Sequence, residues 1–459
     1  MKTLITLLFI CVTTMLHGQL DTIFTGTIAN DKTGTKAREG AYIINRTILK
    51  VNEINDDLAS VQPGYVIEKI STTYHARPGR NTGLTAYSGA TAATVINQAI
   101  AALTSGGDIY FKQGIYTITA SIVDGGNSDI NLIFEKGAKL TAGNALNLPV
   151  IYLTSVSRWR VKGMEIDGNK ANQTAPDGSG APQTDGFWAH GCNDIIVSDA
   201  YIHDCGRFGA NFDYSSTYSG IENSHITLCG WNGINLGNLY TDVGLFAVNN
   251  EVSHCSDVGI TTYGTSCRIV GNYIHHMDGT AGYINSQWAI GLEGSDGTIG
   301  NNIISQNRIT TTGTAIAVVS GRPGNIITDN MITNISLASY SGALIIYSAN
   351  NTIKGNRITS TDADVVAMWI EGNNNLIQGN IMIAVRGIRT GDNCDNTFIN
   401  ANWFQCSTVG ILIPYASNDN TRIIENDFDA CTDDVDVSGT GTIFGNNVWK
   451  DGTYDNSPP

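Results

Sequence analysis

A repeated segment constrains this chain more than any other feature. From Asp185 onward, a short stretch of alternating residues returns at intervals of roughly 25 residues. Each stretch opens on Gly or Ala, as in Gly186-Phe-Trp-Ala-His190 and Gly233-Ile-Asn-Leu-Gly237. A second signature returns with it, as in Ile353-Lys-Gly-Asn-Arg-Ile358. Because the alternation has a period of two, the pattern predicts β-strands that each bury one face.

Such short strands cannot stand alone. A strand of about five residues completes its buried face by stacking on the same strand of the next repeat, about 4.8 Å away. The Gly-Asn pair of the second signature supplies a residue that tolerates positive φ where the chain turns a corner. No window keeps a helical period over a whole repeat. The sequence therefore predicts an all-β fold, a single parallel β-helix (solenoid) of about eleven or more coils over residues 85–450.

The region before the repeats has a different pattern. Thr91 to Leu103 is a short amphipathic stretch that predicts a helix, stopped by Gly106-Gly107 and followed by strand-like residues. A solenoid must cover its first coil or expose an apolar end, so this helix is the expected N-terminal cap. Residues 20–84 are interpreted as an N-terminal extension, and residues 451–459 as a C-terminal tail.

The beginning of the chain predicts export. Lys2, the apolar run from Leu4 to Leu16 and the small or polar residues after it are typical of a secretory signal peptide, which we assign to residues 1–19. We therefore expect a secreted protein, periplasmic or extracellular. No later segment has the roughly 18 apolar residues of a membrane span. The net charge of −15 disfavours nucleic acid and anionic lipid as partners, and we expect a monomer.

Eight cysteines follow the predicted signal peptide, and no two have the CxxC spacing of a zinc site. Cys205, Cys229 and Cys255 take the same place in three successive coils. We expect them to form an inward ladder of thiols rather than disulfides, because stacked cysteines act as small apolar groups.

Several segments together resemble a known superfamily. The predicted helix followed by GGDIYFKQGIYTI, then LIFEKGAKLTAG, RVKGMEIDGNK and the Gly-Asn-x-Ile coils are similar to the pectate-lyase-like superfamily of right-handed parallel β-helix carbohydrate-active enzymes. The resemblance covers roughly residues 85–450 and implies a right-handed β-helix with a polysaccharide substrate. This superfamily includes hydrolases, lyases, epimerases and non-catalytic phage or adhesin proteins. The Asp-Pro-His sequence expected of mannuronan epimerases is absent, as are the clustered Asp pairs of polygalacturonase-like hydrolases.

The resemblance also indicates where a substrate would lie. In such solenoids the outward residues of one strand form a column along the axis, and the third and fifth residues of each alternating stretch are the outward ones here. We expect the chemistry to lie with Glu293, Asp213, His190 and Tyr263. The residues expected to bind substrate are Trp188, Asn211, Asn235, Tyr347, Trp369, Glu371 and Arg389. We expect the members between Trp188 and Glu293 to share one solvent-facing surface.

The predicted function is that of a glycoside hydrolase acting on an extracellular polysaccharide, with acidic or sulfated sugars included. Glu293 is the expected general acid, Asp213 or Asp257 activates water, and His190 and Tyr263 position the sugar. Long inserts at 170–184 and 278–288 enter beside this region, which favours a site there. No cofactor is required and no metal site is expected, although Asp-rich loops are compatible with Ca²⁺.

Two alternatives stay open. In a polysaccharide lyase, Arg389 or Ca²⁺ would neutralise a uronate, and His190 or Tyr263 would remove the C5 proton. Uronate lyases of this fold usually present Lys or Arg as the base, and neither column contains Lys. Asp213 would then only orient His190. The second alternative is a glycan-binding β-helix protein without catalysis.

Overall fold

The structure is a computed structural model of the chain. It describes residues 64–79, 82–174, 184–277, 288–294, 300–310, 313–319, 321–333, 342–360, 362–363, 365–392, 394–415, 420–429, 431–437, 441–449 and 454–455. The predicted signal peptide, most of the predicted extension, the centres of both long inserts and most of the predicted tail lie outside the described residues. Gly64–Pro78 and Gly83–Pro459 belong to one compact unit.

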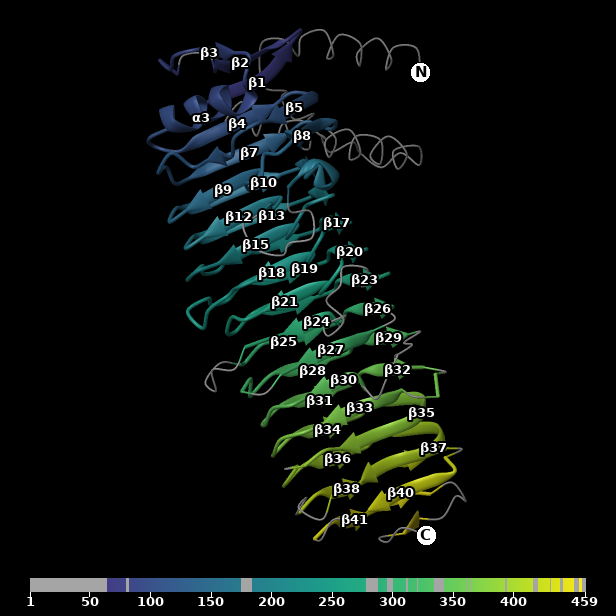
Figure 1. The fold of residues 1–459 in the computed structure, drawn as a ribbon. Coiled ribbons are helices and arrows are strands. Elements are labelled where there is room, and N and C mark those ends of the chain that lie inside the picture. The colour runs from purple at the N-terminus through teal and green to yellow at the C-terminus, as the bar shows by residue number, and fades with distance from the viewer. Residues whose placement is uncertain are drawn as a thin grey trace, which may run out of the picture. The chain divides into compact units, whose positions relative to one another are not determined.

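This unit is a parallel β-helix of about twelve coils, which confirms the predicted fold. Each coil contributes one strand to each of three stacks, and equivalent strands of successive coils pair in parallel (Figure 1). The second and third stacks count as one 26-stranded sheet, because the long strands β35 (Ile381–Thr390) and β37 (Trp403–Ile413) run through both.

The first stack starts with β1 (Tyr65–Ile70), which pairs in parallel with β4. A hairpin of β2 (Thr73–Pro78) and β3 (Tyr87–Gly89) adds antiparallel strands to it. Its other strands are β4 (Gly107–Phe111), β7 (Ile130–Phe134), β10 (Ser157–Lys162), β13 (Asn193–Ser198), β16 (Gly220–Glu222), β19 (Phe246–Val248), β22 (Arg268–Val270), β25 (Ile303–Ser305), β28 (Ile326–Thr328), β31 (Thr352–Lys354), β34 (Leu376–Gln378), β36 (Phe398–Asn400), β38 (Arg422–Ile424) and β41 (Ile443–Gly445). Pairing in this stack thus starts before the predicted start of the solenoid at residue 85.

The second stack follows the first in each coil. Its strands are β5 (Gly114–Ile118), β8 (Ala138–Ala142), β11 (Glu165–Asp167), β14 (Tyr201–His203), β17 (His225–Thr227), β20 (Glu251–Ser253), β23 (Tyr273–His275), β26 (Arg308–Thr310), β29 (Met331–Thr333), β32 (Arg357–Thr359), the first parts of β35 and β37, β39 (Asp427–Phe428) and β42 (Asn447–Val448). A last strand, β43 (Tyr454–Asp455), pairs antiparallel with β42.

The third stack carries the alternating stretches on which the sequence analysis rests. Its strands are β6 (Ile122–Val123), β9 (Ile151–Thr154), β12 (Phe187–His190), β15 (Ala210–Asp213), β18 (Ile234–Leu236), β21 (Ile260–Thr262), β24 (Trp288–Leu292), β27 (Thr314–Val318), β30 (Gly342–Ile346), β33 (Val366–Ile370), the second parts of β35 and β37, and β40 (Asp433–Val437).

One helix closes the N-terminal end, as predicted. Helix α3 (Ala92–Ala102) packs against β2, β3, β5 and β6. Its apolar side, which includes Val95, Ile96 and Ile100, is fully buried and joins the core cluster of the solenoid. A short 3-10 helix, η1 (Lys170–Asn172), lies in a connection. None of the helices in the described part of the chain has the length and apolar composition of a membrane span.

Two local devices hold the coils in register. The Gly of the Gly-Asn signature has positive φ, as predicted: φ is 70° at Gly271 and 68° at Gly355. The Asn has a role that the pattern did not reveal, because its buried side chain accepts the backbone N–H of the preceding coil's Asn. The resulting ladder consists of Asn250, Asn272, Asn307, Asn330, Asn356, Asn380, Asn402, Asn426 and Asn447.

The cysteine prediction is confirmed. The eight cysteines after the predicted signal peptide all lie in the described part of the chain, where they are buried thiols outside disulfides. Cys205, Cys229 and Cys255 lie in the core cluster with no exposed surface. A hydrogen bond from the thiol of the coil before, Cys205 for Cys229 and Cys229 for Cys255, raises the pKa of these two thiols, and burial raises it further, so they stay protonated inside the solenoid.

Candidate functional site

The predicted outward columns exist on the third stack. Strand pairing aligns Trp188 with Asn211, Asn211 with Asn235 and Asn235 with Thr261. The same column continues through Gly291, Ala317, Ile345, Trp369 and Arg389. The intervening residues of these strands, such as Phe212 and Ile290, lie in the core. We call this outward side the third-stack face.

Glu293 and Tyr263 meet on this face, as their one-coil separation predicts. The Glu293 N–H donates to the carbonyl of Thr262, which places the two fifth-position residues in adjacent coils. The Tyr263 hydroxyl donates to Glu293 Oε2 over 2.5 Å, and the Thr261 hydroxyl donates to Oε1 over 2.8 Å. Glu293 and Tyr263 are both half-buried. Their side chains therefore have one fixed arrangement and remain accessible.

The Trp288 indole lies beside this pair, over the smallest residue of the column. A Cβ built on Gly291 would lie 2.8 Å from Cε3 of Trp288 and 3.3 Å from Glu293 Oε1. The half-buried Trp288 indole therefore packs directly on Gly291 next to the Glu293 carboxylate, and a larger residue at 291 would push the ring away. A ring face beside a carboxylate is the arrangement that a sugar needs to stack and to react. The sequence analysis did not include Trp288 or Gly291 among the site residues.

The surroundings of Tyr263 determine the protonation state of its phenol. Burial raises the pKa of Tyr263 well above its ordinary value, and the negative charges of Glu293 and Asp257 act in the same direction. Tyr263 is therefore a hydrogen-bond donor near neutral pH rather than a phenolate base. The nearby Arg322, which is buried, donates through Nη1 to the Tyr263 carbonyl over 2.7 Å and braces this corner.

The Asp213 end of the face differs from the prediction. Trp188, Asn211, Asp213 and Asn235 occupy the outward register, but all four are buried, so the expectation that they face solvent was wrong. Asp213 Oδ1 accepts from Trp188 Nε1 over 2.7 Å. Asp213 Oδ2 accepts from Asn211 Nδ2 at 3.1 Å and from Asn238 Nδ2 at 2.8 Å. Neighbouring side chains cover this carboxyl group and use its hydrogen-bonding capacity.

The pairing of His190 with Asp213 is close but indirect. His190 Nδ1 lies 3.4 Å from Asp213 Oδ1, the oxygen that the Trp188 indole occupies. Burial raises the pKa of Asp213 to about 7, and the charges of Asp185 and Asp242 also raise it, against the opposing hydrogen bonds from Trp188 and Asn211. Burial lowers the pKa of His190, so its imidazole is neutral at pH 7.

A buried ion pair that the sequence analysis missed supports this end. Arg207 binds Asp185 through Nε at 2.7 Å and Nη2 at 2.5 Å, and its guanidinium lies 5.3 Å from the Trp188 ring. Asn211 Nδ2 donates to the same Asp185 carboxylate. The only sequence signal was a charge just before Gly186 and another just before Phe208. Charges are common at the corners of a solenoid, so that signal was not specific.

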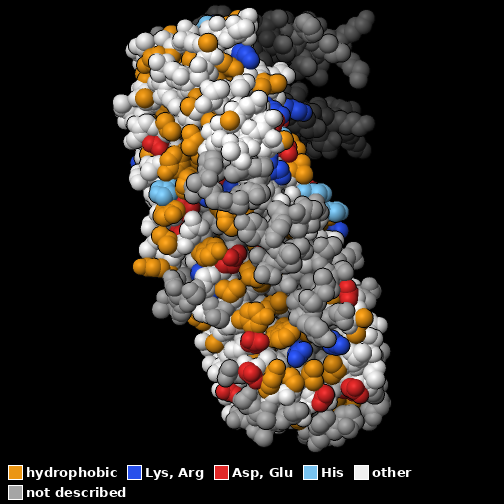
Figure 2. All heavy atoms as spheres, viewed as in Figure 1, with side chains coloured by type: hydrophobic (Ala, Val, Ile, Leu, Met, Phe, Trp, Pro, Cys, Tyr) orange, Lys and Arg blue, Asp and Glu red, His pale blue; other side chains and the backbone are white. Residues whose placement is uncertain are grey.

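The remaining predicted binding residues lie towards the C-terminal end. Tyr347 is exposed, and Trp369, Glu371 and Arg389 are half-buried. The Arg389 guanidinium lies 4.6 Å from the Trp369 ring, and Trp369 Nε1 donates to Glu371 Oε1 over 2.9 Å. Figure 2 shows hydrophobic side chains mixed with Asp, Glu, Lys and Arg over the region of β27 to β37. These residues form a mixed aromatic and polar surface several coils away from Glu293.

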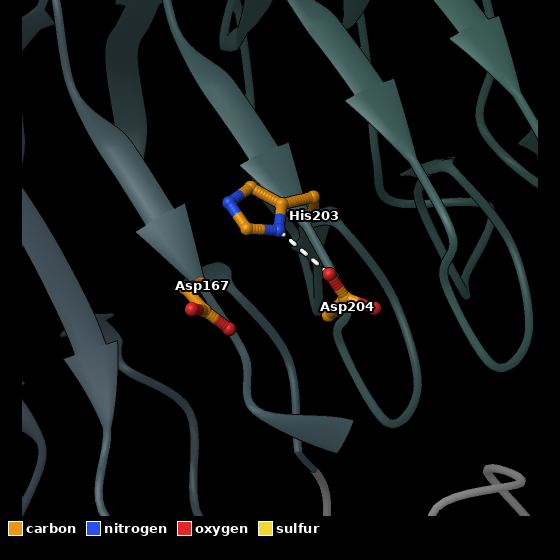
Figure 3. Close-up of side chains that lie close together, drawn as sticks. All are labelled: Asp167, His203 and Asp204. Carbon is orange, nitrogen blue, oxygen red and sulfur yellow. Dashed lines mark hydrogen bonds and ion pairs between the residues drawn. The ribbon is translucent and has the colours of Figure 1, made fainter. Parts of the chain in front are cut away.

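One group of described residues has the composition of a metal site. Asp167, His203 and Asp204 place ligand atoms within 4.8 Å of one another at the ends of β11 and β14 (Figure 3). His203 Nδ1 contacts Asp204 Oδ2 at 2.7 Å, while the ammonium of Lys139 lies 2.9 Å from Asp167 Oδ2. Because Lys139 already neutralises Asp167, we interpret the group as an ion-pair network.

Comparison with known families identifies the class of fold. The sequence model described as "Right handed beta helix region" matches residues 149–332 and 288–449. The chain therefore belongs to this family, which confirms the right-handed parallel β-helix and agrees with the resemblance to carbohydrate-active enzymes of this fold. No curated protein matches the chain in sequence.

Solved structures share the fold at low sequence identity. The A-module of a mannuronan C-5 epimerase from Azotobacter vinelandii is 12% identical with a TM-score of 0.54, over 80% of this chain and 95% of the module. A tailspike protein mutant of E. coli bacteriophage HK620, in complex with a pentasaccharide, is 10% identical with a TM-score of 0.54, over 84% of this chain and 82% of that one. At such identities these structures establish the fold.

Proposed function

We propose that the protein is an exported enzyme that cleaves a polysaccharide by hydrolysis at the third-stack face, with Glu293 at the reacting bond. The observation that carries this proposal is the Glu293 carboxyl group, held by Tyr263 and Thr261 beside the Trp288 indole that packs on Gly291. A fixed carboxyl group next to an aromatic ring suits proton transfer to a glycosidic oxygen, once it is protonated, while the sugar stacks on the ring. The pentasaccharide of the tailspike and the mannuronan of the epimerase are glycans, which supports a glycan as the ligand.

Each described residue around Glu293 has a proposed task. Glu293 transfers the proton to the leaving oxygen. Tyr263 is a positioning residue, because its raised pKa keeps the phenol protonated and its hydroxyl holds one carboxylate oxygen. Trp288 offers the stacking surface, and Gly291 lets the indole lie close to Glu293. Trp369, Tyr347, Glu371 and Arg389 hold more distant sugars of the same chain.

We assign the second carboxylate to Asp257 rather than to Asp213. The charge of Asp257 raises the pKa of the same Tyr263 phenol as the charge of Glu293. Asp257 is 9% exposed, and its Oδ2 accepts a hydrogen bond from Trp231 Nε1. Asp213 has no exposed surface and accepts three side-chain hydrogen bonds, so it cannot activate a water molecule at the surface. Asp213 instead holds Trp188 and Asn211 by hydrogen bonds and lies next to His190.

A polysaccharide lyase is the second candidate, and one observation favours it. His190 is half-buried on the same face, and its lowered pKa keeps the imidazole neutral and able to accept a proton at pH 7. In that mechanism His190 removes the C5 proton of a uronate. The raised pKa of Tyr263 argues against Tyr263 as the base.

One assay separates the two candidates. The full chain is incubated with a panel of neutral, uronic and sulfated polysaccharides, and each digest is read for new reducing ends and for the ultraviolet absorbance of a conjugated alkene. Hydrolysis creates reducing ends alone, whereas β-elimination creates both. Reducing ends without the alkene, lost in the Glu293→Gln variant, support the proposal. Alkene formation that is lost when His190 is replaced would support the lyase instead of the hydrolase. If no glycan of the panel gives a product, both enzyme proposals are wrong.

A further inference from the structure

The coils around Glu293 contain few cationic residues. From residue 171 to residue 350 the chain has four Arg and no Lys, against fourteen Asp and Glu. This stretch includes the third-stack strands from β12 to β30 and the centres of both long inserts, so the count also covers residues outside the described ranges. The cations that these coils can offer to a ligand are therefore Arg207, Arg268, Arg308 and Arg322.

Two of these arginines belong to other stacks. Arg268 begins β22 of the first stack, and Arg308 begins β26 of the second stack. Their guanidinium groups lie 5.7 Å from the Phe246 ring of β19 and 4.9 Å from the Tyr273 ring of β23, respectively. Each of the two side chains thus lies along its own stack, away from the third-stack face.

The other two arginines are buried and already have partners. Arg207 is 7% exposed and binds the Asp185 carboxylate through Nε and Nη2. Arg322 is 2% exposed, and its Nη1 donates to the Tyr263 carbonyl over 2.7 Å. A carboxylate or sulfate group of a sugar would have to displace these partners to reach either guanidinium.

Two further groups of the face can carry a positive charge, but neither does so near Glu293. Burial lowers the pKa of His190, so its imidazole is neutral at pH 7. Arg389 is four coils from Gly291 in the outward column, about 19 Å along the axis. Because physiological salt screens charges beyond about 8 Å, Arg389 does not neutralise an anion at Glu293.

Hydrogen-bond donors on the face bond to the face's own carboxyl groups. The Tyr263 and Thr261 hydroxyls donate to Glu293, and Trp369 Nε1 donates to Glu371. At the other end of the face an indole and two amides donate to a buried carboxyl group. An ionised carboxylate only accepts hydrogen bonds. A sugar hydroxyl can donate to these carboxylates, whereas a sugar carboxylate would compete with them for the same donors.

The charge beside the reacting position is negative. Burial raises the pKa of the Tyr263 phenol, and the charges of Glu293 and Asp257 raise it further. An anionic sugar bound there would meet charges of its own sign, which opposes binding.

We propose that the polysaccharide bound at Glu293 is neutral, with neither carboxylate nor sulfate on its sugars. This inference rests on the proposed function, because it names the substrate class of the same site. A neutral sugar offers hydroxyl donors to the carboxylates and a ring face to Trp288. Neutrality also disfavours the lyase, which needs a uronate.

The test compares one glycan backbone with and without charge. Soluble glucan, mannan and galactan are each prepared in neutral form and in a form whose C6 hydroxyls are oxidised to carboxylates. Calorimetric titration of the full chain gives a dissociation constant for each. At least one neutral form is expected to bind, and its oxidised form to bind about tenfold or more weakly at about 0.01 M salt. The difference should shrink at about 1 M salt, where the screening length is about 3 Å.

Charge variants locate the discrimination on the third-stack face. Val319 is half-buried one coil beyond Glu293, as its N–H donates to the Leu292 carbonyl. Val319→Lys should lower the dissociation constant of the oxidised glycan about 2–5-fold and leave the neutral one unchanged. Val319→Gln is the uncharged control. Ile326→Lys places the same charge on exposed β28 of the first stack and should change neither constant. Trp288→Ala should weaken binding of the neutral glycan.

Several outcomes would overturn the neutral class. These are an oxidised or naturally acidic glycan that binds as tightly as a neutral one, with or without added CaCl₂, the absence of binding by any neutral glycan, and equal effects of Val319→Lys and Ile326→Lys. Hydrolysis is read separately from new reducing ends. Neutral binding without cleavage would remove the hydrolase and keep the neutral ligand, whereas hydrolysis of an acidic glycan would keep the hydrolase and overturn neutrality.

Discussion

Two parts of the third-stack face carry a carboxylate in the same register, yet they differ in what the carboxylate can do. Asp213, at the end of β15, is completely buried and accepts hydrogen bonds from an indole and two amides. Glu293, just after β24, is half-buried and accepts from two hydroxyls. Their neighbours explain the difference, because the Trp188 indole and the Asn238 amide bond to Asp213 and cover it, while the two hydroxyls that bond to Glu293 leave it partly exposed. Register places a side chain on a face, and the size of its neighbours decides whether it can react.

The strongest test of this contrast is Glu293→Gln. The amide keeps the size and the hydrogen-bond acceptor but cannot transfer the proton, so kcat falls by about 10²–10⁴-fold. Substrate binding persists, because the distant residues are untouched. Steady-state kinetics on the active glycan measure the effect, with Glu371→Gln as the matched carboxylate control. Near wild-type turnover in Glu293→Gln would show that this residue is not the acid of a hydrolytic reaction.

The buried carboxylate predicts an effect on stability rather than on turnover. The pKa of Asp213 is raised from 3.8 to about 7 in the folded chain. Between these pH values the folded state binds a proton on Asp213 that the unfolded state does not bind. The stabilisation of the folded state by this proton is therefore complete at low pH and is lost as the pH rises through about 7. The free energy of unfolding should fall by a few kcal/mol between pH 4 and about pH 8.

Asp213→Asn isolates this contribution, since it removes the titrating group while the other acids remain. Thermal melts at a series of pH values are expected to give a flatter profile for the variant than for the wild type. Parallel profiles would show that Asp213 titrates in its ordinary range, and the view of a desolvated carboxyl group would then be wrong.

Tyr263→Phe removes one of the two hydroxyls that hold Glu293. A hydrogen bond to a charged group contributes about 1.5–3 kcal/mol, so kcat should fall by roughly 10–100-fold with a small change in KM. The pH profile of kcat should also move, because the carboxylate loses a donor. A change in KM alone would mean that Tyr263 contacts the sugar and does not position the acid.

Displacing the Trp288 ring should weaken binding. In Gly291→Ala the new methyl group meets the Trp288 ring at 2.8 Å and displaces the platform. A single methyl group in a binding pocket changes the free energy by about 1–3 kcal/mol, so KM should rise about tenfold. Ala317→Ser, one coil further along the same column, is the control that leaves KM unchanged. Equal effects of the two substitutions would show that the Trp288 ring is not part of a subsite.

The smallest effect is expected at the C-terminal end of the face. Arg389→Gln removes the guanidinium from the Trp369 ring, a contact of about 0.5–1 kcal/mol at an exposed site. KM for a long polysaccharide should rise a few-fold, while KM for a short oligosaccharide should not change. If both rise equally, Arg389 lies within the reacting subsite, and the site extends further than Glu293 and Trp288 indicate.

The sequence by itself determined the β-helix, its inward thiols and the outward register of both columns. These follow from period-two alternation and from residues such as Cys229 and Gly271, whose effects are local or repeat identically in each coil. The adjacency of Tyr263 and Glu293 followed for the same reason, because one coil of separation defines one strand spacing.

Tertiary structure alone decided which outward residues are accessible. The burial of Asp213 depends on Asn238 from a loop and on Trp188 from the coil before, and neither contact has a period that a sequence pattern could reveal. The ion pair of Arg207 with Asp185 and the reach of Trp288 over Gly291 likewise join residues at solenoid corners, where spacing varies from coil to coil. Strand periodicity determines the direction of a side chain, but its solvation depends on the volume of neighbours that only the folded chain brings together.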